Sequence, residues 1–328
     1  MKFILLFAIL ASLLVTAFLT PWTIKFMRKI GLMVQDQHKP GKPLVPVSGG
    51  FAVLSGVIAG LMVAIFMQTF FYDAKSDVVL VLAATTSILI ITLVGFIDDL
   101  LIKSDNSSSI GLRQWQKPLL TLAAAIPLMV IGAGISEVYL PLVGVVNLGL
   151  VYSLVIIPLG VIGASNMVNL LGGFNGMEAG LGIIYMGMLG LYAIFHGRQV
   201  AAILALVMFA ALLVYYFYNK VPAKILPGDS LTYLLGGTLA CIAIVGNIER
   251  AAIIISIPFI IEFFLKLRGK FKKHTVGILL PNGKIKSKYK KIYSIPHIFT
   301  RTGKFTEKEI VYAMLVIQLV FASLIWLI

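Results

Sequence analysis

The chain has 328 residues, of which 59% are hydrophobic and only 12% are charged. Its mean hydropathy is +1.01. A soluble domain of this length carries about a quarter charged residues. The composition therefore excludes a soluble single-core protein, an intrinsically disordered chain and a disulfide-linked scaffold, and it predicts a polytopic membrane protein.

Positive charge exceeds negative charge, with 27 Lys and Arg against 13 Asp and Glu and a formal net charge of +14. On a soluble protein this balance indicates nucleic acid, but in a membrane protein it marks cytoplasmic loops and contacts with anionic phosphates. We therefore expect the membrane, and no nucleic acid, as a partner. The single cysteine, Cys241, lies inside an apolar run, which excludes a disulfide and a thiolate-bound metal.

Ten apolar stretches have about the length of a membrane-spanning helix, which needs about 20 residues. They cover approximately residues 3–24, 49–71, 78–97, 117–135, 149–168, 177–195, 199–218, 230–247, 251–267 and 308–328. The pattern predicts an all-α polytopic membrane protein with about ten transmembrane helices, formed as one domain over residues 1–328. Pro158 and Pro258 predict kinks in the fifth and ninth helices. Residues 137–148 are rich in β-branched side chains and predict a short β-hairpin on the outer face.

The loops that follow the odd-numbered stretches hold 23 Lys and Arg residues, and the other side holds 4. The positive-inside rule then places both termini outside and the odd-numbered loops in the cytoplasm, including a basic loop over residues 266–307. Most of the other polar side chains near the membrane boundary fall on the same side. We therefore expect a cytoplasmic functional site, in the cell membrane or, in a eukaryote, in the endoplasmic reticulum membrane.

Asp98 and Asp99 end the third stretch in the sequence Gly-Phe-Ile-Asp-Asp. Adjacent carboxylates are costly near hydrocarbon and indicate a bound cation, a metal or a transferred proton, although a solvated helix end also carries such pairs. Neighbouring side chains on a helix diverge by about 100°, so the two carboxylates are expected to have different partners.

The segment from Asn166 to Glu178 interrupts an apolar stretch with three Asn and three Gly. Irregular backbone at membrane depth must line a cavity or be covered by protein. Glycine permits close approach to a ligand, and amides supply neutral donors and acceptors. We predict a ligand-binding turn, with helix–helix packing by small residues as the alternative.

Three further segments fit a phosphate or metal site, each with a simpler alternative. Asp229, in Pro-Gly-Asp-Ser at the start of the eighth stretch, is either a helix N-cap or a metal ligand. The run Lys272–His274 either clamps a diphosphate or neutralises lipid head groups. Gly49–Gly50 either offers backbone N–H groups to an anion or simply begins a helix. Glu262 lies four residues before Lys266, which predicts an ion pair on one helix.

These motifs, taken together and in this order, resemble the polyprenyl-phosphate N-acetylhexosamine-1-phosphate transferase family, and most closely its dolichyl-phosphate GlcNAc-1-phosphotransferase branch. The matching elements, from Gln35 to about His274, are the Gln35–Lys39 loop, PVSGG, GFIDDL, NMVNLLGGFNGMEAG, PGDS and the basic loop with its His. The resemblance implies ten membrane helices, a cytoplasmic active site, and transfer of a sugar-1-phosphate from a UDP-sugar to a polyprenyl phosphate with release of UMP. It also implies a divalent cation, usually Mg²⁺ with Mn²⁺ as a substitute, and leaves a homodimer open.

The resemblance further implies roles for individual residues. Asn169 and Asp229 match the metal ligands, and Asp98, Asp99 and Lys117 match the catalytic group. The positions that match substrate-binding segments are Gln35, Asp36, Lys39, Asn166, Gly173, Asn175, Glu178, Lys272, Lys273 and His274. Because both substrates are anions, we expect charge neutralisation and alignment to dominate catalysis, with the Asp pair positioning groups rather than removing a proton.

We therefore predict an Mg²⁺-dependent enzyme that transfers N-acetylglucosamine-1-phosphate from UDP-GlcNAc to a dolichyl-type phosphate. The alternatives are the same reaction with another UDP-N-acetylhexosamine or with undecaprenyl phosphate and, in a different class, a secondary transporter. A transporter also carries acidic residues and broken helices, but near the membrane midplane and often in repeats. Here the polar residues gather at one face, and no repeat is evident.

Overall fold

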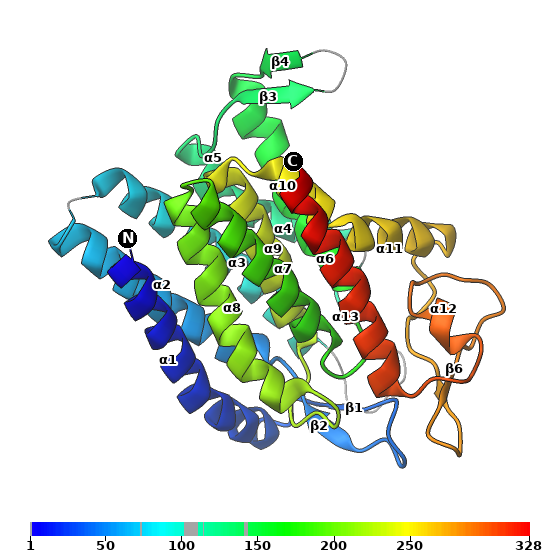
Figure 1. Cartoon of the computed structure of the whole chain (residues 1–328). Helices are drawn as coiled ribbons and strands as arrows, with labels where there is room; N and C mark the ends of the chain where they lie inside the picture. Colours follow the sequence, from blue (N-terminus) through cyan, green and yellow to red (C-terminus); the bar gives the residue numbers. More distant parts are fainter. Residues whose placement is uncertain (1, 73, 102–110, 114, 141–143) are drawn as a thin grey trace.

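The computed structural model describes residues 2–72, 74–101, 111–113, 115–140 and 144–328, and it is mostly helical. Long helices lie side by side in one bundle (Figure 1). Eight helices in these residues are long and apolar enough to cross a membrane: α1 (Lys2–Lys29), α2 (Gly50–Phe70), α3 (Lys75–Leu100), the π-helical turn η2 with α6 (Tyr152–Leu170), α7 (Met177–Phe195), α8 (Gln199–Asn219), α9 (Gly228–Gly246), and α13 (Glu307–Ser323) with the 3-10 turn η3 (Leu324–Leu327). The prediction of a helical, multi-pass membrane protein is confirmed.

The expected count of about ten spanning helices falls to eight, because two apolar stretches do not form single long helices. The stretch predicted at residues 117–135 forms α4 (Gln116–Leu122), the 3-10 turn η1 (Ala123–Ala125) and α5 (Ile126–Val130). Together they are about 22 Å long, which is shorter than the ~30 Å hydrocarbon core. The left-handed backbone of Gly132 (φ +58°) follows and prevents the helix from continuing.

The ninth predicted stretch is divided into α10 (Glu249–Ile255) and α11 (Ile257–Arg268). Pro258 cannot donate a backbone hydrogen bond and its ring crowds the preceding turn, which favours a break in the helix here. At the break, the carbonyl oxygen of Ile255 accepts a hydrogen bond from Gln318 Nε2 at 2.9 Å. The predicted kink is confirmed, and α11 runs outward from the bundle (Figure 1).

The kink predicted at Pro158 is also confirmed as an interruption of regular α-helix. The π-helical turn η2 (Tyr152–Ile156) comes directly before α6 (Ile157–Leu170), and Pro158 lies in the first turn of α6. In a π-turn each hydrogen bond spans five residues instead of four. The carbonyl groups before Pro158 are therefore displaced from their α-helical positions, which relieves their clash with the proline ring.

The other elements in the described residues are three antiparallel strand pairs and one short helix: β1 (Met33–Gln35) with β2 (Leu44–Pro46), β3 (Glu137–Leu140) with β4 (Gly144–Asn147), β5 (Ile278–Leu279) with β6 (Ile285–Lys286), and α12 (His297–Thr300). The hairpin predicted for residues 137–148 is confirmed, with Glu137 opposite Asn147. It lies at one end of the bundle, and β1–β2 lies at the other (Figure 1). We call the end with β1–β2 and residues 266–307 the basic end; both chain termini lie away from it.

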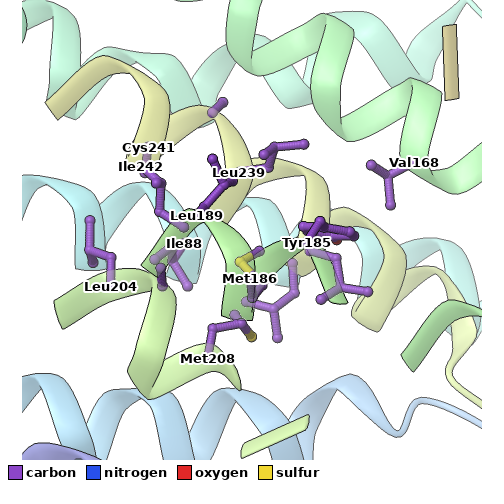
Figure 2. Close-up of a cluster of buried hydrophobic side chains, with 14 of the residues drawn as sticks. Ile88, Val168, Tyr185, Met186, Leu189, Leu204, Met208, Leu239, Cys241 and Ile242 are labelled. Carbon is purple, nitrogen blue, oxygen red and sulfur yellow. The ribbon is translucent and has the colours of Figure 1, made fainter. Parts of the chain in front are cut away.

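The centre of the bundle is α9, in which every residue from Ser230 to Gly246 is buried. It contacts α3, α6, α7 and α8. Figure 2 shows apolar side chains of all five helices meeting in one cluster that includes Cys241. Gly236 brings the backbone of α9 against α6, since a Cβ built there would lie 2.5 Å from the carbonyl oxygen of Ala164. The end of α6 and the start of α9 are therefore fixed relative to each other at the basic end.

Small side chains bring α1, α2 and α8 together. A Cβ built on Gly60 of α2 would lie 2.7 Å from the carbonyl oxygen of Ala8 and 2.7 Å from Cγ1 of Val207. Ser12 Oγ donates a hydrogen bond to the carbonyl oxygen of Val207 at 2.9 Å. In a membrane, where helices gain little hydrophobic energy from association, such close approach lets dispersion and interhelical hydrogen bonds hold the bundle.

We expect Gly60→Ala to lower the midpoint of thermal unfolding in detergent by about 2 °C or more, because overpacking a close contact costs about 1–3 kcal/mol. Gly160→Ala in α6 is the matched control, since nothing lies within 4 Å of the added methyl group. Alanine favours helix over glycine, so the control should leave the midpoint unchanged or slightly raised. Intrinsic fluorescence during heating measures both variants, and equal losses would contradict the close packing at Gly60.

Candidate active site

A cavity of about 580 Å³ lies at the basic end of the bundle. Its wall comes from the loop after α1, the residues around the start of α4, the α6–α7 turn, the start of α9 and the segment after α11. Ten predicted site residues line it: Gln35, Asp36, Lys117, Asn169, Gly173, Asn175, Glu178, Asp229, Lys273 and His274. The fold thus brings residues from five separate stretches of sequence into one site.

Lys117 lies at the centre of a charged cluster between α3, α4 and α9. Its Nζ pairs with the carboxylate of Asp98 and lies 2.9 Å from Asp229 Oδ2. The amide of Asn169 donates to the same oxygen of Asp229 at 3.2 Å. The side chains of Lys117 and Asp229 are 24% and 25% exposed, against 3% for Asp98. One ammonium group therefore bridges a buried carboxylate and a carboxylate that faces the cavity.

Asp98 is engaged on both sides. Its Oδ1 accepts a hydrogen bond from the backbone N–H of Leu112 at 2.6 Å, and its carboxylate pairs with Lys117. The first contact ties the segment before α4 to the end of α3. The second holds the lysine at the cavity wall, so Asp98 is connected to the cavity through Lys117.

Asp99 faces the start of α9, away from Asp98, as the geometry of neighbouring helix positions predicts. It is fully buried and accepts hydrogen bonds from Asp229 N at 2.6 Å, Ser230 N at 3.1 Å and Ser48 Oγ at 2.7 Å. The first N–H groups of a helix favour a negative charge. Gly228 has φ +68°, and a Cβ there would lie 2.7 Å from Asp99 Oδ1. The N-cap interpretation of Asp229 is wrong, because Asp99 caps the helix and Asp229 lies in its first turn.

The turn between α6 and α7 depends on two glycines with left-handed backbone, Gly173 (φ +107°) and Gly176 (φ +86°). Glu178 Oε1 accepts from the N–H of Gly173 at 2.7 Å. The side-chain amide of Asn175 donates to Asp36 Oδ2 at 2.7 Å. The segment is therefore a constrained turn at the cavity rather than a helix-packing element, which favours the predicted ligand-binding turn.

The basic segment after α11 reaches the cavity through Lys273 and His274. It is held from behind by Lys266, which also lines the cavity although it is only 6% exposed. Lys266 Nζ donates to Thr275 Oγ1 at 2.6 Å and to the carbonyl oxygen of Lys273 at 3.1 Å. The predicted helix ion pair between Glu262 and Lys266 is confirmed at 3.6 Å. A buried pair on α11 thus anchors the segment.

Five predicted site residues, all within the described part of the chain, lie outside the cavity wall: Lys39, Asp98, Asp99, Asn166 and Lys272. Asn166 donates to the carbonyl oxygen of Ile162 at 2.8 Å and to Thr121 Oγ1 at 3.3 Å, so its amide links α6 to α4. Lys39 pairs with Glu307 at the start of α13.

Gly49–Gly50 is a packing element, and its interpretation as an anion site is wrong. The two N–H groups donate to the carbonyl oxygens of Leu226 at 3.0 Å and Pro227 at 3.3 Å. A Cβ on Gly50 would lie 2.5 Å from the backbone nitrogen of Leu231. Glycine is needed here because the start of α2 crosses directly against the start of α9.

Comparison with known proteins decides which family carries this arrangement. Residues 78–247, slightly more than half of the chain, match glycosyl transferase family 4. A candidate UDP-N-acetylglucosamine–dolichyl-phosphate N-acetylglucosaminephosphotransferase of Saccharolobus solfataricus is 32% identical over 320 residues, which cover 97% of this chain and 94% of that protein. The chain belongs to glycosyl transferase family 4.

Two further relatives cover both chains almost completely. A protein of Sulfolobus acidocaldarius with the same description is 31% identical over 326 residues, 98% of this chain and 94% of the relative. The phospho-N-acetylmuramoyl-pentapeptide-transferase of Halalkalibacterium halodurans is 30% identical over 335 residues, 98% of this chain and 96% of the relative. As a family 4 member, the protein is an enzyme that transfers a sugar-1-phosphate from a UDP-sugar to a polyprenyl phosphate, so the resemblance found in the sequence is confirmed.

The donors of this family 4 site fit a magnesium ion. Asp229 presents a partly exposed carboxylate to the cavity, and the amide of Asn169 lies beside it. Among the described residues there is no group of three His, Cys, Asp or Glu that could enclose a metal ion. Mg²⁺ prefers oxygen ligands and commonly binds through one or two carboxylates with the remaining ligands from water and substrate phosphates. Asp229 and Asn169 would supply one carboxylate and one amide oxygen of this kind at the cavity wall.

The motifs do not point to two residues that the fold places at or directly behind the family 4 site. Lys266 had a recognisable signal, because a Glu262–Lys266 pair at the end of an apolar stretch is costly unless it is placed against a polar partner. Glu307 had only a local signal, an acidic residue in the first turn of a helix, which stabilises helices generally. Its contact with Asn175, 132 residues away, is visible only in the folded chain.

The protonation of His274 should make substrate binding depend on pH. Burial, together with the positive charges of Lys266 and Lys288, holds the pKa of His274 below its ordinary value of 6.5. The imidazole is therefore neutral near pH 7, and a diphosphate bound nearby favours its protonated form. Binding of a UDP-sugar should take up a proton, so affinity should strengthen as the pH falls below about 6.5, while the diphosphate keeps its charge.

The measurement is UDP-GlcNAc binding by calorimetry between pH 7.5 and 5.5. We expect His274→Gln to flatten the gain in affinity seen in the wild type. His196→Gln, at the opposite end of α7, is the control and should retain it. The same pH dependence in the wild type and in His274→Gln would remove His274 from the diphosphate site.

Proposed function

We propose that this family 4 enzyme transfers N-acetylglucosamine-1-phosphate from UDP-GlcNAc to a dolichyl-type polyprenyl phosphate and releases UMP, with Mg²⁺ as cofactor. The observation that carries the proposal is the convergence of Lys117, Asp229 and the Asn175 turn on one cavity that also holds Lys273 and His274. The descriptions of the two archaeal relatives, at 32% and 31% identity, support this choice of sugar and lipid.

The chemistry requires two anions to approach each other. A phosphoryl transfer of this kind is catalysed chiefly by alignment and by stabilisation of charge. Among the residues that the structure describes, three lysines line the cavity, Lys117, Lys266 and Lys273. We assign Lys117 to the reacting phosphates, because it is held between two carboxylates beside Asn169, and the basic segment to the diphosphate and sugar.

The acidic pair has a positioning role in this proposal. Asp98 is occupied by Lys117 and by the N–H of Leu112, and Asp99 is occupied by two N–H groups at the start of α9 and by the hydroxyl of Ser48. A phosphate monoester is already largely ionised near neutral pH. The acceptor therefore needs no strong base, and the pair serves to hold Lys117 and Asp229 in place.

Asn169 and Asp229 would hold Mg²⁺ through their side-chain oxygens. The bound ion would offset the negative charge of the diphosphate during transfer. Thr232 Oγ1 donates to Asn169 Oδ1 at 3.0 Å, and this contact orients the amide from behind. The Asn175 turn, with Gly173 at the cavity, would receive the uracil base.

We assign the lipid chain to a second, apolar cavity. A cavity of about 290 Å³ lies between η2–α6, α9 and the α10–α11 break, and its lining is almost entirely apolar. Met167, two residues before Asn169, lies in its wall. A polyprenyl tail lying in this groove would leave its phosphate close to Asn169 and Lys117.

Specific observations bear on the two alternatives to this function, another substrate and a transporter. A different sugar donor is supported by the Halalkalibacterium halodurans relative at 30% identity, whose description names a phospho-N-acetylmuramoyl-pentapeptide transfer. Undecaprenyl phosphate as the acceptor is the other alternative within the same reaction. A secondary transporter is disfavoured, because the polar cavity lies at one end of the bundle and the chain belongs to a transferase family. The excess of Lys and Arg in the loops predicted to be cytoplasmic, 23 against 4, supports a cytoplasmic active site.

UMP release by purified protein in detergent tests the proposal. With Mg²⁺ and dolichyl phosphate, we expect UDP-GlcNAc to react at least about tenfold faster than UDP-GalNAc or UDP-N-acetylmuramoyl-pentapeptide. Asp229→Asn should lower the rate by about 100-fold or more, because it removes a charge at the reacting phosphates. Asp77→Asn, in the first turn of α3 at the other end, is the control with normal activity. Faster reaction with the pentapeptide substrate, or no UMP release with any donor, would overturn the assignment.

A further inference from the structure

Glu307 is a buried carboxylate without a role in the function described so far. It lies in the first turn of α13, and it is 5% exposed. Its Oε2 pairs with Lys39, and its Oε1 lies 3.6 Å from His38 Nδ1. Burying a carboxylate costs free energy unless hydrogen bonds and opposite charges compensate it. A carboxylate this buried therefore has a role other than keeping the surface soluble.

Capping of α13 is not that role. Thr306 is the N-cap and accepts a hydrogen bond from Glu309 N, while the Glu309 side chain accepts from Thr306 N at 2.8 Å. This capping box already satisfies the helix terminus with an exposed glutamate. The carboxylate of Glu307 is directed elsewhere, toward the α6–α7 turn.

The distant partner of Glu307 is Asn175, the central residue of that turn. The backbone N–H of Asn175 donates to Glu307 Oε1 at 2.9 Å, and its side-chain amide donates to Asp36 Oδ2 at 2.7 Å. Asn175 lines the cavity, whereas Glu307 lies behind it. Two carboxylates from opposite ends of the chain therefore hold the backbone and the side chain of one cavity residue.

His38 connects the same turn to the basic segment. Its ring stacks on Phe174 with 4.7 Å between ring centroids and an interplanar angle of 21°. Its Nε2 accepts a hydrogen bond from the N–H of Gly277 at 3.1 Å. With Glu307 beside its other ring nitrogen, His38 joins the first loop, the turn, the basic segment and α13 into one unit. Glu307 is the member of this unit that touches the backbone of the turn itself.

We propose that Glu307 is a positioning residue for nucleotide binding: it fixes the Asn175 turn through the backbone N–H of Asn175, and so sets the affinity for the uridine part of the donor. The inference rests on the proposed function only in taking Gly173 and Asn175 as the uracil-binding turn. Without this carboxylate, the N–H of Asn175 loses its partner, Lys39 is left with its longer pair with Asp36 at 3.9 Å, and the turn can move away from the base.

The test compares UDP binding to the full-length protein in detergent, with Mg²⁺, for Glu307→Ala, Glu307→Gln and Glu309→Ala. We expect Glu307→Ala to weaken UDP binding by about tenfold or more, because it removes a hydrogen bond to a charged group. Glu307→Gln keeps an acceptor oxygen at the same reach and should weaken binding by less than about threefold. Glu309→Ala removes an acid of the same helix turn that does not contact Asn175, and it should bind UDP like the wild type.

In turnover, Glu307→Ala should raise the KM for the UDP-sugar by a similar factor and change the KM for the polyprenyl phosphate by less than about twofold. A purely structural role would weaken both substrates, and would make Glu309→Ala behave like Glu307→Ala. Either result would overturn the proposal. If Glu307→Ala cannot be purified, Glu307→Asp replaces it: its charge is kept but its reach is one methylene shorter, so weakened UDP binding is again expected and unchanged binding overturns the proposal.

The proposed function and this inference fail differently. If the wild type binds UDP but releases no UMP from UDP-GlcNAc, the proposed substrate is wrong, while the comparison of Glu307 and Glu309 variants still decides the role of Glu307. If the wild type releases UMP and Glu307→Ala binds UDP normally, the function stands and the positioning role is wrong.

Discussion

The carboxylate of Asp99 is fully buried where α3, α9 and the segment before α2 meet, and it accepts three hydrogen bonds there. A buried charge is tolerable only with such donors, and two of them are the first N–H groups of α9, where the helix dipole favours an anion. The position of Asp229 at the cavity follows directly, because its own backbone N–H is one of these donors. Gly228 and Gly50 allow the close approach that the contact requires.

The same physical arrangement recurs around the cavity, with a buried acid behind each of two cavity-lining lysines. Asp98 holds Lys117, and Glu262 holds Lys266. Removing either partner of a buried pair leaves an uncompensated charge, so each lysine is kept in one position. The cavity therefore holds two ammonium groups in fixed positions, each balanced by a buried carboxylate, and such fixed groups can align anionic phosphates.

Much of this was predictable from the sequence, because it depends on local chemistry. Apolar stretch length predicts membrane helices, Pro158 and Pro258 predict helix breaks, and recognisable polar motifs predict which residues gather at the cavity. The predictions that were wrong concern residues whose partners are distant in the sequence. Gly49–Gly50 resembles an anion site in the sequence, but in the fold it packs against the start of α9. Likewise, Glu307 looks like an ordinary helix-start acid until the fold places it beside Asn175. The predicted number of membrane helices was too high partly because one short stretch ends at Gly132, which has a left-handed backbone. The length of an apolar stretch does not reveal such a backbone feature.

The central claim is that the acidic pair works by holding other groups, with Asp98 acting through Lys117. A double-mutant cycle on the rate of UMP release tests it most directly, using Asp98→Asn, Lys117→Met and the combined variant. If Asp98 acts only through the lysine, each single change should lower the rate strongly, and the double variant should be no slower than Lys117→Met alone. Losses that multiply in the double variant would show that Asp98 acts on the substrates independently, and would contradict the account.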